Sequence, residues 1–167
     1  KLAKKGESFN HKIADQKNQV MWTSGMSRQH GQTPEALLEL CNKHINGFDL
    51  ICVSTAMNKA THLLASNITN EQKNELQKLM LKLVTVVSRF DFKNDRREAE
   101  KSDRTILSAD PLAQMIWSLG KTGIYKQCPM NFRRLIYYFR VHFSSLNFES
   151  SEKQKNLSTA CANAMHG

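Results

Sequence analysis

The residues best suited to chemistry lie between positions 111 and 148, and they suit binding rather than catalysis. Arg133, Tyr137 and Arg140 recur at spacings of four and three, which places them on one side of a helix. No acidic residue occurs between Asp110 and Glu149. Guanidinium groups beside an aromatic ring can neutralise phosphates and stack on bases. The pattern predicts a polyanion-binding surface with the candidate residues Lys121, Lys126, Arg133, Arg134, Tyr137 and Arg140.

The same stretch carries the apolar residues needed to hold such a surface in place. A helix over about residues 131–146 is predicted by apolar side chains at three- and four-residue spacing, namely Phe132, Leu135, Ile136, Phe139, Phe143 and Leu146. A preceding helix over residues 111–119 is expected to stop at the glycines of residues 120–123. We therefore expect a helical hairpin that is apolar inside and cationic outside. Tyr125 and Trp117 are further candidates for base stacking, although Trp117 is favoured as a core residue.

Length and charge narrow the class of protein. The chain has 167 residues, is 40% hydrophobic and contains only 3 prolines, which fits one mainly helical domain or a piece of a repeat array. Its net charge is +9 and its pI is near 9.5. Such a charge favours a nucleic-acid partner, and the alternative is a basic, solvated surface.

The distribution of charged and apolar residues divides the chain into an arm and a helical domain. Residues 1–33 hold six Lys or Arg against two acidic residues and lack a sustained period, so we expect an extended basic arm, with room for a short helix over residues 10–21. Lys4, Lys5 and Lys12 are its candidate phosphate contacts, the alternative being an unstructured terminus. Residues 34–167 are expected to form the helical domain, with a charged insertion over about residues 89–108 that is either a solvated helix or a loop within one repeat.

Three helices are expected between the arm and the insertion. Thr33 and Pro34 are typical of a helix start, and Gly47 of its end. A second helix is predicted over about residues 50–66, with Val53, Met57, Ala60, Leu63 and Leu64 inward. A cap over residues 67–72 begins the third, which should end near Phe90. Its buried stripe is the most regular of the chain and comprises Leu76, Leu79, Met80, Leu83, Val84 and Val87.

Three segments share a plan that predicts stacked helix pairs. Residues 53–60, 112–119 and 157–164 can be laid over one another, and Ser-Thr-Ala is identical in the first and third. Each follows a more apolar helix that ends close to Phe48, Phe90 or Phe148. Without the insertion, the intervals approach a period of about 40 residues, as in helix-pair solenoids. The expected fold is all-α, with antiparallel helix pairs stacked as a short α-solenoid, and the alternative is an irregular helical bundle.

These segments resemble the octotricopeptide repeat of organellar RNA-binding proteins and the related repeats that precede RAP domains in FAST-kinase-like proteins. LAQMIWSLGKTG over residues 112–123 matches the second-helix phrase of that family best, and residues 156–165 and 53–60 match it less closely. The resemblance covers roughly residues 33–167. It implies RNA binding in a mitochondrion or a plastid, in RNA maturation, in translation control or as a ribosome component. The short chain, the arm and the insertion favour a structural component of a mitochondrial ribosome that contacts rRNA and neighbouring proteins.

Other chemistries find little support in the sequence. The Gly-Lys-Thr of residues 120–122 lacks the upstream glycine of a phosphate-binding loop and follows a helix instead of a strand. No nucleophile elbow, zinc-protease motif or paired-carboxylate site is present. The four cysteines lack zinc-site spacing and are expected to be buried free thiols. We therefore expect no enzyme, no cofactor, no metal, no small-molecule substrate and no membrane span, and the alternative to RNA binding is a protein-binding scaffold.

Overall fold

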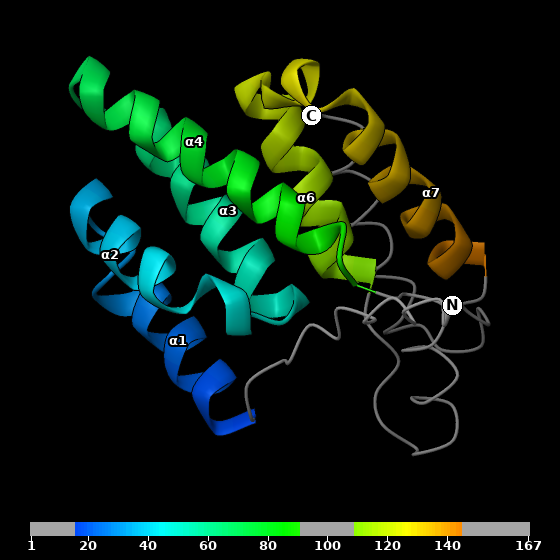
Figure 1. Ribbon diagram of the computed structural model, residues 1–167, viewed down its shortest axis with the longest axis horizontal. Helices are drawn as coiled ribbons and strands as arrows, with labels where there is room; N and C mark the ends of the chain where they lie inside the picture. The colour runs from blue at the N-terminus through cyan, green and yellow to red at the C-terminus, as the bar shows by residue number, and fades with distance from the viewer. Residues whose placement is uncertain (1–15, 91–108, 145–167) are drawn as a thin grey trace, which may run out of the picture.

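The computed structural model describes residues 16–90 and 109–144, and this part of the chain is helical without any strand. The expected all-α class is therefore confirmed. The elements are α1 (Gln16–Arg28), α2 (Pro34–His44), η1 (Ile45–Gly47), α3 (Leu50–Leu64), α4 (Asn70–Val87), α6 (Ala109–Thr122), η2 (Ile124–Gln127) and α7 (Pro129–Ser144), as Figure 1 shows.

Side-chain caps start α2, α3 and α4 where the sequence places polar residues. The Thr33 hydroxyl accepts a hydrogen bond from the N–H of Ala36 at 3.3 Å, and the Asp49 carboxylate accepts one from the N–H of Cys52 at 2.7 Å. Each cap satisfies a backbone donor that the first helical turn leaves open. The predicted starts of α2 and α3 are confirmed, because both caps hold the helix entries at the expected residues.

The start of α4 is a reciprocal capping box. Thr69 accepts from the N–H of Gln72 at 3.2 Å, while the Gln72 amide oxygen accepts from the N–H of Thr69 at 2.8 Å. The Gln72 amide nitrogen also donates to Glu35 at 2.5 Å, which joins the first turns of α4 and α2. This bond holds the pKa of the Glu35 carboxyl below its usual value. A local sequence signal thus also contributes a contact between two helices.

Two helices end at other residues than the glycines that the sequence analysis expected. The first helix of the expected hairpin does not stop at Gly120 but continues to Thr122, and the turn is made by Gly123 at φ 71°. That left-handed conformation suits glycine because a Cβ would be strained there. Gly47 likewise does not end α2, since His44 is its last residue and Gly47 closes the short η1.

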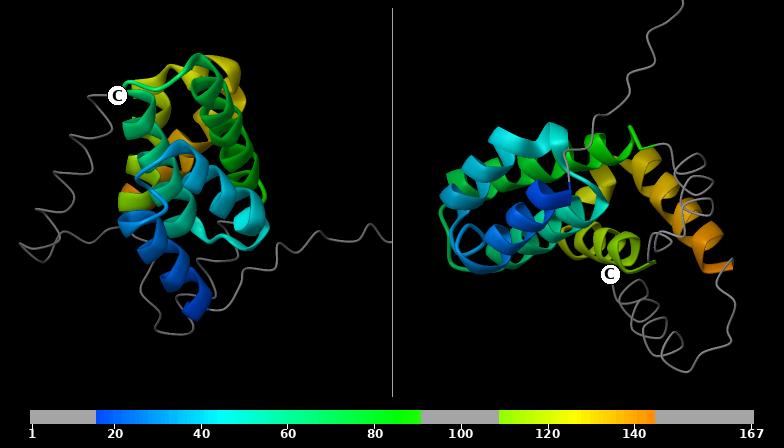
Figure 2. Two further views of the ribbon diagram at one scale, coloured as in Figure 1. Left: turned by 90° about the vertical axis from the view of Figure 1, so that its left-hand side faces the viewer. Right: turned by 90° about the horizontal axis from the view of Figure 1, so that it is seen from below.

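Helix α3 occupies the centre of the molecule and contacts α1, α2, α4 and α6, while α2 also contacts α4, and α6 contacts α7. Helices α1 and α2 lie at one end and α7 at the other, as Figures 1 and 2 show. The stripe predicted for α4 is buried at all six positions, whereas Leu64 of α3 is half-buried and lies at the edge of the core. The largest fully buried side chains are Phe48, Met26, Leu37, Met57, Leu76, Leu79, Met80, Leu83, Leu112, Met115, Leu119 and Ile124.

The expected arm is helical over residues 16–28, which form α1 and pack against α3; the short helix allowed over residues 10–21 is present from Gln16 and runs on to Arg28. Trp22 and Met26 are buried, and the Trp22 ring stacks on His44 with 4.7 Å between centroids. Gln19 is buried too: its amide nitrogen donates to the carbonyl of Gly47 at 2.6 Å, and its amide oxygen accepts from the N–H of Asp49 at 3.0 Å. This part of the expected arm therefore belongs to the helical body.

Several predicted features lie outside the described residues. They are the first 15 residues with Lys4, Lys5 and Lys12, the charged insertion from residue 91 onward, and the third repeat segment with Cys161. The helix α7 continues to Ser144, but the side chain of Phe143 and residue Leu146 also fall outside what is described.

Candidate nucleic-acid interface

The exposed side of α7 combines cations with large apolar side chains. Arg133, Tyr137 and Arg140 are all exposed, and Tyr137 keeps 57% of its surface accessible. Met130 at 72% and Val141 at 36% exposure flank them. At 100° per residue these five positions share one arc of the helix. Arg133, Tyr137 and Arg140 therefore lie together on the side of α7 away from its apolar face, as the spacing predicted.

The opposite side of α7 fixes the helix on its neighbours. Leu135 and Phe139 are buried, while Phe132 and Ile136 are half-buried against the core. The ring of Phe132 also packs on that of Tyr125 in η2, with 5.2 Å between centroids. Because this packing orders α7, the exposed arc is presented on a defined scaffold and binding need not order the helix.

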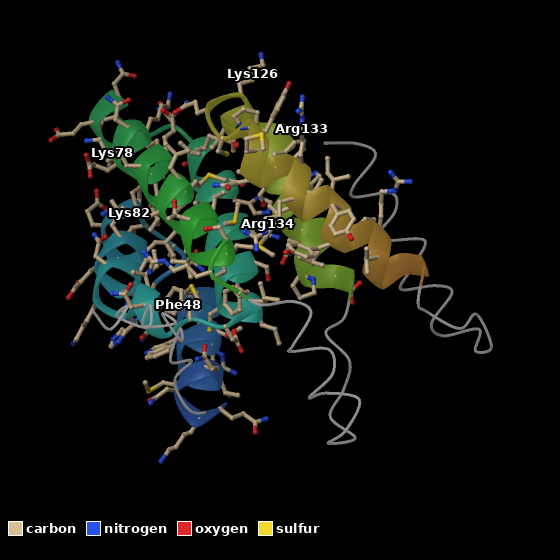
Figure 3. All side chains as sticks on the ribbon, turned by 45° about the vertical axis from the view of Figure 1, so that its right-hand side comes forward. Phe48, Lys78, Lys82, Lys126, Arg133 and Arg134 are labelled. Atoms are coloured by element: carbon tan, nitrogen blue, oxygen red, sulfur yellow. The ribbon has the colours of Figure 1, made fainter. Side chains whose placement is uncertain are left out.

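Arg134 differs from Arg133 in having partners within the protein. Its Nη1 donates to the backbone carbonyl of Ser88, just beyond α4, at 3.0 Å. Its Nε donates to the Tyr138 hydroxyl at 3.0 Å, and the guanidinium carbon lies 5.4 Å from the Tyr138 ring centroid. Arg134 thus ties α7 to the C-terminal end of α4 while its side chain remains exposed. Figure 3 labels both residues on α7, with Arg134 on the side that faces α4.

Of the two lysines predicted near the hairpin turn, Lys121 is exposed in the last turn of α6 and Lys126 is exposed in η2. The Lys126 ammonium lies 6.0 Å from the Tyr125 ring centroid, at the outer limit of a cation–π contact. No carboxylate of the described residues forms an ion pair with Lys121, Lys126 or Arg133. These cations are therefore available to an external anion.

The three candidate stacking rings differ in accessibility. Tyr125 is half-buried beneath Phe132. Trp117 is half-buried beside His62 of α3, with ring centroids 5.9 Å apart. Tyr137 is the exposed ring of the three. It packs edge-to-face with the ring of Tyr138, with 5.7 Å between the ring centroids. The geometry therefore favours Tyr137 as a stacking platform and leaves Trp117 a packing role, as the sequence suggested.

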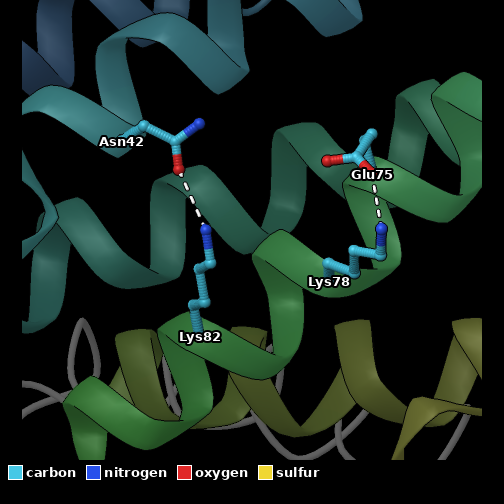
Figure 4. A network of polar contacts seen from close by, with 4 residues as sticks. All are labelled: Asn42, Glu75, Lys78 and Lys82. Carbon is cyan, nitrogen blue, oxygen red and sulfur yellow. Dashed lines mark hydrogen bonds and ion pairs between the residues drawn. The ribbon is translucent and has the colours of Figure 1, made fainter.

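Sequence reasoning missed the cations of α4. Lys78, Lys82 and Arg89 recur at spacings of four and seven on the exposed side of that helix and its final turn. Lys78 donates to Glu75 at 2.7 Å and holds the pKa of that carboxyl below its usual value. Lys82 donates to the Asn42 amide oxygen of α2 at 3.3 Å, and Figure 4 shows both contacts. The helical spacing opposite the buried stripe was the available signal.

Charge is strongly one-sided over this part of the molecule. From Lys78 to the end of α7, the described residues contain eight Lys or Arg and one acidic residue, Asp110. Lys78, Lys82, Lys126, Arg133 and Arg134 are visible together in Figure 3. Such a field attracts polyanions and raises their rate of encounter.

No other group of side chains in the described regions forms a reactive constellation. His, Cys, Asp and Glu do not gather there in threes that could hold a metal ion. Cys41 and Cys52 are buried free thiols, and burial raises the pKa of each to about 12. Cys128 is a half-buried free thiol whose pKa is also raised by burial. Among the helices described, none is both long and apolar enough to cross a membrane.

No family model, curated protein or solved structure matches this chain. The resemblance to organellar helical repeats therefore remains a prediction from sequence motifs. Two of its three segments lie on α3 and α6, which contact each other.

Proposed function

We propose that this protein binds RNA through the exposed side of α7, as a helical-repeat component of an organellar ribonucleoprotein complex. The observation that carries the proposal is the arc of Arg133, Tyr137 and Arg140 on a helix whose other side is anchored in the core. Arginines there would neutralise phosphates and release counterions, and Tyr137 would stack on an unpaired base. The protein acts by binding, without catalysing a reaction.

The repeat architecture is part of the same proposal. In stacked helix pairs, equivalent helices of successive pairs lie next to each other. The contacts of α2 with α3, of α2 with α4 and of α3 with α6 fit a pair made of α2 and α3, against which α4 and α6 stack. Helix α7 then begins a third pair, and α1 stands beside α3 as the second helix of an earlier one. We infer a short α-solenoid with α7 near one end.

The cellular setting follows from the motif resemblance. The segment at residues 112–123, which lies on α6 and the turn after it, resembles the octotricopeptide repeat. We propose a mitochondrial ribosome as the site of action, with rRNA and neighbouring ribosomal proteins as partners. A plastid, or a role in RNA maturation or translation control, is the alternative setting.

A second function is favoured by a specific observation. Met130 and Val141 expose large apolar surfaces beside the arginines, and apolar side chains next to Arg and Tyr are typical of protein interfaces. A protein-binding scaffold that grips an acidic partner is therefore the alternative. Salt dependence of RNA binding separates the two functions, because phosphate contacts weaken steeply as salt rises.

Charge reversal on α7 tests the proposal directly. The variant Arg133→Glu with Arg140→Glu should weaken binding of fluorescein-labelled single-stranded RNA by at least about tenfold, since two phosphate contacts become repulsive. The measurement is fluorescence anisotropy at low and moderate salt. Thermal unfolding of the variant is measured beside that of the original protein, so that a loss of stability is distinguished from a loss of RNA affinity.

The matched control is Lys17→Glu with Arg28→Glu, which makes the same charge change on α1 at the other end of the molecule. It should lose much less affinity than the α7 variant. Equal losses in both variants would mean that net charge, and not the α7 surface, governs binding. RNA affinity that is absent or insensitive to salt would favour the protein-binding scaffold.

A further inference from the structure

The junction between α4 and α7 combines an apolar floor with a cationic rim. A small hollow there is lined by Val84, Val87 and Leu135, together with Ser88, Arg134 and Tyr138. Arg134 spans the junction, because it belongs to α7 and donates to the carbonyl of Ser88 after α4. The two helices therefore form one continuous surface at this point.

Arg134 is held in a fixed orientation at the centre of this surface. Two of the five N–H donors of its guanidinium are used by Ser88 and Tyr138, and the side chain remains exposed. A guanidinium that is already oriented loses less side-chain entropy when it binds an anion. Its remaining N–H groups can donate to a phosphate oxygen without giving up either existing bond.

The α4 side of the junction supplies further cations. Arg89 follows directly on Ser88, and Lys82 lies two turns earlier on the exposed side of α4, where it donates to the Asn42 amide oxygen of α2 at 3.3 Å. Neither Lys82 nor Arg89 forms an ion pair with a described carboxylate. On the α7 side, Arg133 is the neighbour of Arg134. Arg89 and Arg133 thus stand on the two sides of the junction next to Arg134, and Lys82 lies farther along α4 toward α2.

We propose that the RNA strand crosses from α7 to α4 over Arg134, with its phosphodiester backbone held by Arg134, Lys82 and Arg89. This inference rests on the proposed RNA-binding function and extends it to a second helix. The competing explanation is local: cations near the C-terminus of α4 offset the helix dipole and need no ligand. That explanation predicts an effect on stability without an effect on RNA affinity.

The first test neutralises the α4 side. Lys82→Gln with Arg89→Gln should weaken binding of a fluorescein-labelled oligouridylate by about 15-fold at about 0.15 M salt, or about fourfold per lost phosphate contact. The slope of log K against log salt should become shallower by about 1.4. The matched control, Lys17→Gln with Arg28→Gln, removes the same charge from α1 and should leave the slope unchanged.

The second test concerns the orientation of Arg134. Arg134→Lys keeps the charge but loses the planar fork, so it should lose affinity measurably, and Arg134→Gln should lose more. Each variant is measured well below its own unfolding temperature, which thermal melting defines. Lower melting temperatures with unchanged RNA affinity would assign Arg134 to the joining of the helices alone and overturn the inference for this residue.

The two proposals fail in distinguishable ways. If the Arg133 and Arg140 variant loses affinity while the α4 variant behaves like the α1 control, RNA is confined to α7 and the crossing is wrong. If the unaltered protein shows no salt-dependent affinity for the oligouridylate or for a structured RNA, the proposed function fails and the crossing fails with it. If the α7 variant and the α4 variant each lose RNA affinity and each show a shallower dependence of log K on log salt, both proposals are supported.

Discussion

Arg133 and Arg134 are neighbours in the sequence and lie in different surroundings in the fold. Arg133 extends from α7 without a carboxylate partner among the described residues, whereas Arg134 donates to Ser88 and Tyr138. Helical rotation of 100° between consecutive residues explains the difference. The sequence placed both in one candidate set, but only Arg134 faces α4, because the position of α4 depends on the whole fold.

Thiol reactivity provides a prediction at the residue scale. Iodoacetamide at about pH 8 should modify Cys128 well before Cys41 or Cys52. Cys41 and Cys52 are buried with pKa values of about 12, so they hold almost no reactive thiolate at that pH. Peptide mass spectrometry reads each site separately, and reaction in urea is the control in which all three should be modified. Equal native rates at Cys41 and Cys128 would contradict the packing of α2 on α3.

Local signals were most informative for helices with strong caps and a regular apolar stripe, and least informative for α1. The buried residues of α1 are Gln19, Trp22 and Met26, while its apolar Val20 and Met21 face outward. A buried glutamine beside exposed apolar residues obscures the helical pattern. Gln19 is stable inside because its amide bonds to Gly47 and Asp49, and those partners are 28 and 30 residues away.

The turn between α6 and α7 gives a prediction at the scale of the element. Gly123→Ala should destabilise the protein by about 1–2 kcal/mol, the cost of placing an L-residue in the left-handed region. No atom lies within 4 Å of the added Cβ, so the cost comes from the backbone alone. Gly123→Asn should cost less, because asparagine tolerates this conformation better. Urea unfolding measures both, and equal costs for Ala and Asn would point to a steric cause instead.

At the scale of the whole molecule, the exposed surface of α7 depends on the burial of its other face. Helices α1 and α2 lie at one end and α7 at the other, with α3 between them. The cations of α4 and α7 are far apart in the sequence, and the contact of Arg134 with Ser88 brings their helices together across 46 residues. A surface of this kind is lost if α7 detaches, even when every cation is retained.

Detachment of α7 can be tested with one substitution. Leu135→Asp should destabilise the protein by about 3–5 kcal/mol, because Leu135 is only 2% exposed and the new carboxylate would be buried without a partner. Arg133→Asp, two residues earlier on the exposed side, should change stability by about 0.5 kcal/mol or less. Thermal and urea unfolding report both changes. Similar stability of the two variants would mean that α7 is not packed as described.

The sequence by itself determined the all-α class, the starts of α2, α3 and α4, the buried stripe of α4 and the two faces of α7. These features depend on residues within one or two turns of each other, so spacing and capping reveal them. The tertiary structure alone decided that residues 16–28 pack against α3, that Lys82 donates to Asn42 of α2 and that Arg134 binds Ser88 at the junction of α7 with α4. Each of these depends on partners distant in the sequence, whose positions follow from how whole helices bury their apolar faces together.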